Sequence, residues 1–115
     1  MLNKKLLGSV SAPPSEYVED VFSAYLYTGN GSTQTITNGI DLAGKGGLTW
    51  IKSRGASGAN SLIDTAKGRS SLLISNSTGA ELTSSANKDL VSFNSDGFTV
   101  GPVSQVFLNN SGATY

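Results

Sequence analysis

The sequence contains no cysteine and no histidine, and each absence excludes a class of chemistry. Without cysteine there is no disulfide, no thiolate nucleophile and no thiolate ligand for zinc. Without histidine the chain lacks the side chain that most often serves as a general base near neutral pH and as a ligand of transition metals. We therefore expect no enzymatic activity and no cofactor.

Charge is also scarce. Eight Lys and Arg residues balance eight Asp and Glu residues, and charged residues make up 14% of the 115 residues, against roughly 25% in an average domain. Glycine contributes 14 residues, and serine, threonine and asparagine are abundant. A neutral chain of this kind fits neither phosphate neutralisation on a nucleic acid nor a polyelectrolyte tail. Its length suits one domain.

Long hydrophobic runs are missing as well. Lys4 and Lys5 followed by Leu6 and Leu7 resemble the start of a secretory signal, but the apolar run ends at Gly8. A signal needs an apolar core of about 7–15 residues, and a membrane span needs about 18. The sequence therefore predicts neither a targeting segment nor a membrane association.

The first twenty residues differ in composition from the rest. Paired prolines, Pro13 and Pro14, favour extended backbone, and the segment has too few large apolar groups for a core. We expect 1–20 to be an extended arm that becomes ordered on a partner, because it is more apolar than a free tail needs. Its partner-docking residues are predicted to be Leu2, Leu6, Leu7 and Val10.

From residue 21 onward, short apolar stretches alternate with turns rich in Gly, Asn, Ser and Asp. Pairs such as Asn38-Gly39 and Asp96-Gly97 are typical of tight turns. Many short strands without a long helical period predict an all-β fold, an antiparallel β-sandwich of jelly-roll type over 21–115. The expected strands are 32–37, 48–53, 61–65, 71–75, 90–94, 97–100 and 105–108.

The stretch 17–28 carries two patterns. Tyr17, Val21 and Tyr25 recur at helical spacing, whereas residues from Phe22 onward alternate and are rich in aromatics, as in a strand. We expect a strand over 22–28, preceded by extended chain or one helical turn.

The large apolar groups at strand centres are the predicted core. Trp50, the only tryptophan, is expected to be buried because Leu48 and Ile51 flank it, although an exposed tryptophan in this position would suit stacking on a sugar ring. The residues expected to be mostly buried are Leu48, Trp50, Ile63, Leu73, Phe93 and Phe98.

Patterns that suggest chemistry are weak. Asp64 and Asp96 are candidates for a glycosidase pair or, for Asp96, a calcium ligand, but no spacing singles out the pair, and a hairpin turn accounts for Asp96. Residues 44–47 resemble a phosphate loop, yet a strand rather than a helix is expected to follow, so we reject nucleotide binding. The cations Lys52, Arg54, Lys67 and Arg69 are interpreted as solvated surface.

An ordered set of segments resembles a repeated β-sandwich module of concanavalin-like, jelly-roll character in virion proteins of tailed bacteriophages. The segments are YLYTGNGSTQTITNGIDLAGKGGLTWIKSR (25–54), SLIDTAKGR (61–69), LLISNSTGAEL (72–82), LVSFNSDGFTVG (90–101) and NNSGATY (109–115). The chain departs from the family pattern at 64–69, which weakens any role for Arg69. The family pattern also continues past Tyr115 with an apolar strand, so the domain is expected to continue there. The alternative is that a neighbouring subunit covers the sheet edge that a missing strand would expose.

The resemblance implies a structural protein of the phage particle, the N-terminal end of a tail fibre or tail spike. The arm and sandwich would dock on other virion proteins, a tail adaptor or the baseplate, and such fibres are usually homotrimers. Two alternatives are a capsid decoration or other head protein, and a carbohydrate-binding or depolymerising module.

Overall fold

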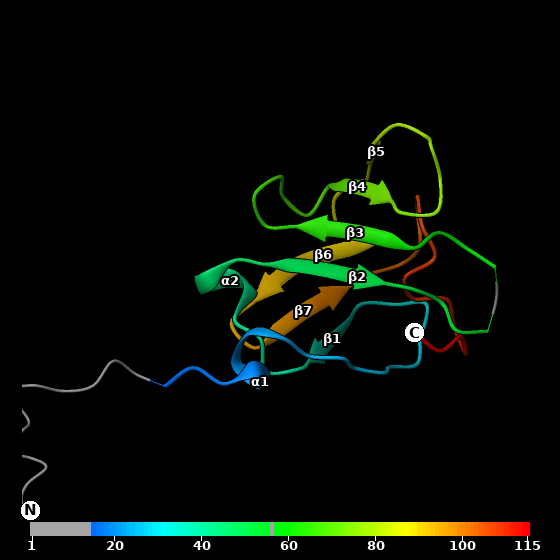
Figure 1. Ribbon diagram of the computed structural model, residues 1–115. Coiled ribbons are helices and arrows are strands. Elements are labelled where there is room, and N and C mark those ends of the chain that lie inside the picture. The colour runs from blue at the N-terminus through cyan, green and yellow to red at the C-terminus, as the bar shows by residue number, and fades with distance from the viewer. Residues whose placement is uncertain (1–14, 56) are drawn as a thin grey trace, which may run out of the picture.

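The computed structural model describes residues 15–55 and 57–115, and within them seven short strands form two antiparallel sheets (Figure 1). One sheet has the order β1-β7-β6, and the other has the order β2-β3-β4-β5. The strands are β1 (Gln34–Thr37), β2 (Leu48–Ile51), β3 (Ser61–Asp64), β4 (Ser71–Ile74), β5 (Leu82–Thr83), β6 (Leu90–Asn94) and β7 (Gly97–Val100). The predicted all-β sandwich is confirmed.

The tight turn between β6 and β7 follows from local sequence. Asn94 pairs with Gly97 across the hairpin, and Gly97 has a φ of 154°. A Cβ at this position would collide with the main chain of Ile36 on the neighbouring strand β1. Glycine is therefore required both for the turn and for the close approach of β1 to β7.

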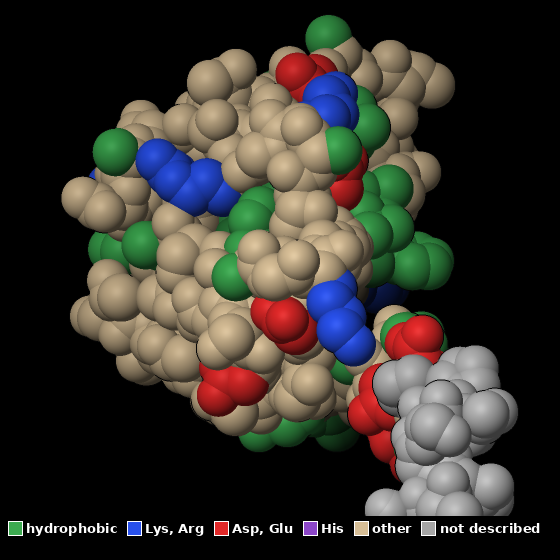
Figure 2. All heavy atoms as spheres, turned by 90° about the vertical axis from the view of Figure 1, so that its left-hand side faces the viewer, with side chains coloured by type: hydrophobic (Ala, Val, Ile, Leu, Met, Phe, Trp, Pro, Cys, Tyr) green, Lys and Arg blue, Asp and Glu red, His purple; other side chains and the backbone are tan. Residues whose placement is uncertain are grey.

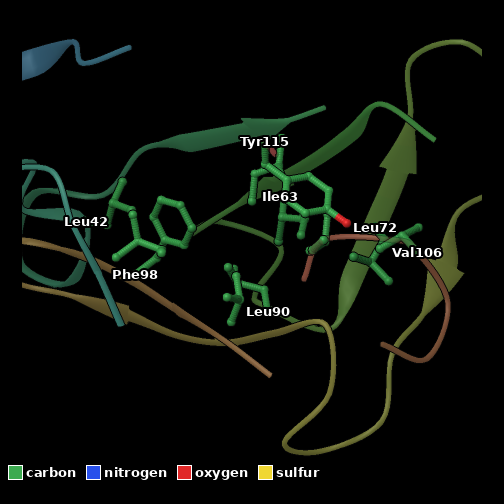
Figure 3. Close-up of a cluster of buried hydrophobic side chains, with 11 residues drawn as sticks. Leu42, Ile63, Leu72, Leu90, Phe98, Val106 and Tyr115 are labelled. Atoms are coloured by element: carbon green, nitrogen blue, oxygen red, sulfur yellow. The ribbon is translucent and has the colours of Figure 1, made fainter. Parts of the chain in front are cut away.

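The core lies between the two sheets, and residues from both contribute to it (Figure 3). Strands β2 and β3 bury alternate residues, as strands of a sheet with one solvated face do. Turns and loops after the last strand add more apolar groups. The buried apolar residues are Ile36, Leu42, Ile51, Ile63, Leu72, Leu90, Phe98, Val100, Val106, Leu108 and Tyr115.

The core prediction was right for Ile63 and Phe98, which are buried, whereas Phe93 is half-buried. It was wrong for Trp50, Leu48 and Leu73, which are 66%, 58% and 41% exposed. Alternation explains these errors, because only one face of each strand meets the other sheet. The buried positions beside them are Thr49 and Ile51 on β2 and Leu72 on β4.

The strand predicted at 22–28 is not formed. A single helical turn, α1 (Val18–Val21), precedes this segment, in agreement with one of the two expectations. Residues 22–27 then run without regular structure, and Thr28 makes an isolated antiparallel bridge with Thr114. The segment thus has a pairing partner only at its end, which is too little for a strand.

The strand predicted at 105–108 is also wrong. The backbone N–H groups of Gln105 and Val106 donate to the carboxylate of Asp89 rather than to a neighbouring strand.

Two elements were not predicted, β5 and the short helix α2 (Leu42–Lys45). The side chain of Asp41, the N-cap of α2, accepts a hydrogen bond from Gly44 N–H at 2.7 Å. Both helices in the described residues are four residues long, so neither can cross a bilayer.

Candidate functional site

The two carboxylates considered as a catalytic pair belong to different sheets. Asp64 ends β3, and its side chain accepts a hydrogen bond from Lys67 N–H at 2.8 Å. Asp96 lies in the turn between β6 and β7, where its backbone carbonyl accepts from Asn38 and Gly39. Residues 15–55 and 57–115 hold no group of three or more acidic side chains placed to bind a metal ion. The turn interpretation accounts for Asp96, and Asp64 lies at the end of its predicted strand.

The four cations have separate environments, and Figure 2 shows Lys and Arg side chains in separate groups on the face in view. Lys67 forms an ion pair with Glu81. Nη1 of Arg69 is buried with no hydrogen-bond partner among the described residues. Lys52 and Arg54 instead line an apolar groove.

This groove has a volume of about 890 Å³. One wall is formed by residues 21–27 and the other by residues 48–54. Its floor contains the core residues Leu42, Ile51 and Phe98. Hydrophobic side chains gather on one side of the surface in Figure 2. The large apolar residues that line the groove and remain exposed are Val21, Phe22, Tyr25, Leu26, Leu48 and Trp50.

A buried carboxylate, Asp89, lies apart from the groove. It is fully buried and accepts hydrogen bonds from Ser84 Oγ at 2.5 Å, from Ser104 N–H at 2.9 Å and from Gln105 N–H at 3.0 Å. Asp89 also has a positive φ of 50°, which is unusual outside glycine. These bonds tie the loop that follows β7 to the start of β6, so the role of this carboxylate is structural.

A second buried polar side chain, Asn109, joins two distant turns. Its Oδ1 accepts from Asn30 N–H at 2.9 Å and from Gln34 Nε2 at 2.6 Å, and its Nδ2 donates to Gly101 O at 3.2 Å. Sequence reasoning missed both residues: Asn109 stands in a stretch read as a turn, and no pattern distinguished Asp89 from the other carboxylates. Nothing in one sequence distinguishes a buried Asn or Asp from a solvated one.

Tyr27 lines the groove together with Phe98 and Tyr115. Its hydroxyl donates to Leu108 O at 2.6 Å, and its ring packs edge-on against Phe98 at 6.3 Å between centroids. Burial raises the pKa of the Tyr27 phenol above its ordinary value, and the neighbouring Tyr115 adds to the shift. The phenol therefore acts as a neutral hydrogen-bond donor.

The predicted docking residues of the arm, Leu2, Leu6, Leu7 and Val10, lie outside the described residues. Of the arm predicted over 1–20, the structure describes residues 15–20. These six residues are exposed, and the last three of them belong to α1.

The two antiparallel sheets, the buried hydrogen-bonded side chains of Asp89 and Asn109, and the apolar groove define an all-β sandwich with exposed apolar side chains along the groove. Residues 14–115 match the family described as a domain of unknown function, DUF7483, and the chain belongs to that family. No curated protein and no solved structure matches the chain.

Proposed function

We propose that this chain is a structural module of a tailed bacteriophage particle, the N-terminal tail-attachment region of a fibre or spike. It works by docking and not by catalysis. Its partners are a tail adaptor or baseplate protein and further copies of itself in a homotrimer, and it requires no cofactor. The ordered segments within 25–115 that resemble phage virion modules support this assignment.

The observation that carries the proposal is an apolar surface where the arm meets the sandwich. Tyr17, Val18, Val21 and Phe22 are each more than 60% exposed, and α1 buries no residue. We name these four residues the junction surface. Large apolar groups clustered in this way mark protein contacts, and tyrosine and phenylalanine are enriched in such contacts.

The local geometry keeps the junction surface in a defined shape. The side chain of Asp20 accepts a hydrogen bond from Tyr17 N–H at 2.9 Å, and Phe22 N–H donates to Val18 O at 2.7 Å. The turn is therefore closed by its own hydrogen bonds rather than by packing on the core. A preformed surface loses less conformational entropy when it binds a partner.

Deletion of the arm tests the attachment role in the phage. A protein lacking residues 2–12 is expected to keep its circular dichroism spectrum and melting temperature, because the described core residues all lie later in the chain, and to be absent from purified particles. Normal occupancy of the deletion protein in the particles contradicts an attachment role for the arm.

A matched pair of substitutions tests the junction surface. Phe22→Ser and Phe107→Ser each remove one exposed phenylalanine, and both are expected to change folding free energy by less than about 0.5 kcal/mol. Only Phe22→Ser is expected to lower the amount of protein in particles. Equal occupancy for the two variants contradicts docking through the junction surface. Detection in separated heads instead of tails would favour the capsid-decoration alternative.

A carbohydrate-binding module is a second candidate, because Trp50 is exposed beside a groove that also exposes Tyr25. Exposed aromatic rings provide flat apolar faces on which a sugar ring can stack. Binding of the isolated chain to a glycan array, lost in Trp50→Ala and kept in Phe107→Ala, would favour this candidate. An array without signal favours the attachment role.

A further inference from the structure

Strand β2 has a free edge beside the groove. Within its sheet it pairs only with β3. Thr65 N–H donates to Gly47 O at 3.0 Å, so the odd-numbered residues here direct their backbone groups toward β3. Because backbone groups alternate along a strand, those of Leu48 and Trp50 point the other way. Neither residue has a backbone hydrogen-bond partner among the described residues.

The facing wall of the groove also carries unpaired backbone. Residues 23–26 line the groove and make no backbone hydrogen bond within the described part of the chain. Phe22, near the start of this wall, is extended, with φ −145° and ψ 133°. Free N–H and C=O groups therefore border the groove on both sides.

At the end of the groove that is lined by Tyr27 and Arg54, the gap between the walls is one strand wide. Tyr115 exchanges backbone hydrogen bonds of 3.1 and 2.9 Å with Tyr27 on one side. On the other side, Thr114 O accepts from Arg54 N–H at 2.8 Å. A single extended segment suits a gap of this kind, because both of its edges are free to pair. The edge strand of a second folded sheet has only one free side.

One uncharged stretch of the sequence has the length that such a strand needs. Residues 6–12 (LLGSVSA) lie between Lys5 and Pro13 and contain no proline, so each of their N–H groups can donate. They number seven, as do residues 48–54, which form one wall. Extended stretches with the same number of residues have the same length.

The apolar residues of 6–12 also alternate. In a strand the even-numbered positions share one face, which holds Leu6, Val10 and Ala12. The odd-numbered face holds Leu7 and two serines. The even-numbered face therefore matches the groove floor, which contains core residues. A slip of one residue would place the serines against the core, so the alternation fixes which face points inward.

We propose that the groove of each copy receives residues 6–12 of a neighbouring copy of this chain as an added β-strand. The strand pairs through its backbone with β2 on one side and with residues 23–26 on the other. It covers the free edge of β2, which is otherwise open to unspecific pairing. The proposal rests on the self-association proposed above and names the surface that the arm binds.

The link between the arm and the sandwich favours a neighbouring copy over the same copy. Pro13 and Pro14 favour extended backbone, and Tyr17 is extended, with φ −105° and ψ 160°. Five extended residues, 13–17, span about 16 Å. Entry into the chain's own groove, which Val21 lines, requires a reversal within this link. Exchange of one element between identical copies is a low-cost route to oligomers, and around a closed ring it fills every groove.

The test measures association and amide hydrogen exchange of the purified 115-residue chain at increasing protein concentration. An oligomer is expected by analytical ultracentrifugation. In the oligomer, exchange at Leu48 and Trp50 should slow at least tenfold, because their N–H groups gain partners, and Trp50 fluorescence should shift to the blue. A chain that lacks residues 2–12 should stay monomeric without these changes. A synthetic peptide of residues 1–14, added to that shortened chain, should restore the slow exchange.

A matched pair of substitutions within the arm makes the test specific. Val10→Asp places a carboxylate on the inward face of the added strand, where burial of an unpaired charge is costly, and it should abolish both the oligomer and the slow exchange. Ser9→Asp places the same charge on the outward face and should keep both. Neither variant alters a described core residue, so the melting temperature of the monomer should be unchanged.

Four results would overturn the proposal. They are unchanged exchange at Leu48 and Trp50 at high concentration, equal behaviour of Val10→Asp and Ser9→Asp, an oligomer that forms equally well without residues 2–12, and slow exchange in a monomer, which would place the arm in its own groove. Because these measurements use only purified chain, a negative result leaves attachment to the particle standing. Absence of the wild-type chain from purified phage would contradict attachment and leave the arm exchange untouched.

Discussion

The rings of Tyr27 and Tyr115 stack with their centroids 5.2 Å apart and an angle of 20° between their planes. Their backbones also exchange two hydrogen bonds, and the Tyr115 hydroxyl accepts a bond from Asn110 N–H at 3.0 Å. Ring stacking, backbone pairing and the hydrogen bond from the Tyr27 hydroxyl to Leu108 O hold Tyr27, near the start of the sandwich, against the last residues of the chain. Both tyrosines line the apolar groove.

The raised pKa of Tyr27 predicts a loss of stability in alkaline solution. In the unfolded chain the phenol ionises near pH 10, its ordinary value, whereas in the folded chain burial keeps it neutral to higher pH. Stability from this group is therefore complete below about pH 10 and falls as pH rises beyond it. Urea unfolding from pH 8 to 11 should show this fall in the wild-type chain.

Tyr27→Phe is the matched variant for that experiment. It should cost about 1–2 kcal/mol at pH 8, because Leu108 O loses its hydrogen bond, and its stability should depend less on pH above 10. Tyr17→Phe, at an exposed position, should behave as wild type. Parallel pH curves for wild type and Tyr27→Phe would show that Tyr27 is not the group responsible.

Replacement of Asp89 should be among the most damaging single changes. Asp89→Asn places an NH₂ group among the donors of Ser84, Ser104 and Gln105, and we expect a cost of about 2–4 kcal/mol. Asp96→Asn makes the same chemical change in an exposed turn whose hydrogen bonds use the backbone carbonyl, and it should cost less than about 0.5 kcal/mol. Urea unfolding of both proteins measures the difference, and similar losses would contradict the structural role of Asp89.

Exposure of Trp50 predicts that truncating it has little effect on the 115-residue chain. Trp50→Ala should cost less than about 1 kcal/mol, whereas Ile63→Ala, at a fully buried position, should cost about 2–5 kcal/mol. Wild-type fluorescence should have the emission maximum of a solvated indole. A blue-shifted maximum in dilute 115-residue protein is incompatible with this exposure.

Gly29 has no room for a side chain. A Cβ there would collide with the backbone of Asn110 and lie 2.8 Å from the carbonyl carbon of Asn109. Because backbone cannot move aside as a side chain can, Gly29→Ala should destabilise the domain by about 2 kcal/mol or more. Gly55→Ala, in open space, should be neutral or stabilising by up to about 1 kcal/mol. Thermal unfolding of the two variants checks the contrast.

The sequence by itself determined the fold class and most strand positions. Short apolar stretches separated by Gly, Asn and Asp turns predicted two packed antiparallel sheets, and the Asp96-Gly97 turn lies where it was expected. These features depend on neighbours within a few residues along the chain, so local pattern is enough to find them. Of the large apolar residues at strand centres that were expected to be buried, Ile63 and Phe98 are buried.

Only the tertiary structure decided which face of each strand is buried and which loops are tied down. Trp50 and Ile51 are both apolar neighbours on β2, and the position of the second sheet alone makes Ile51 the buried one. The carboxylate of Asp89 takes the backbone N–H groups that a strand at 105–108 would have used. The groove exists because residues 21–27 and 48–54, far apart in sequence, become the two walls of one gap. Such relationships depend on long-range packing, which periodicity along a single chain does not encode.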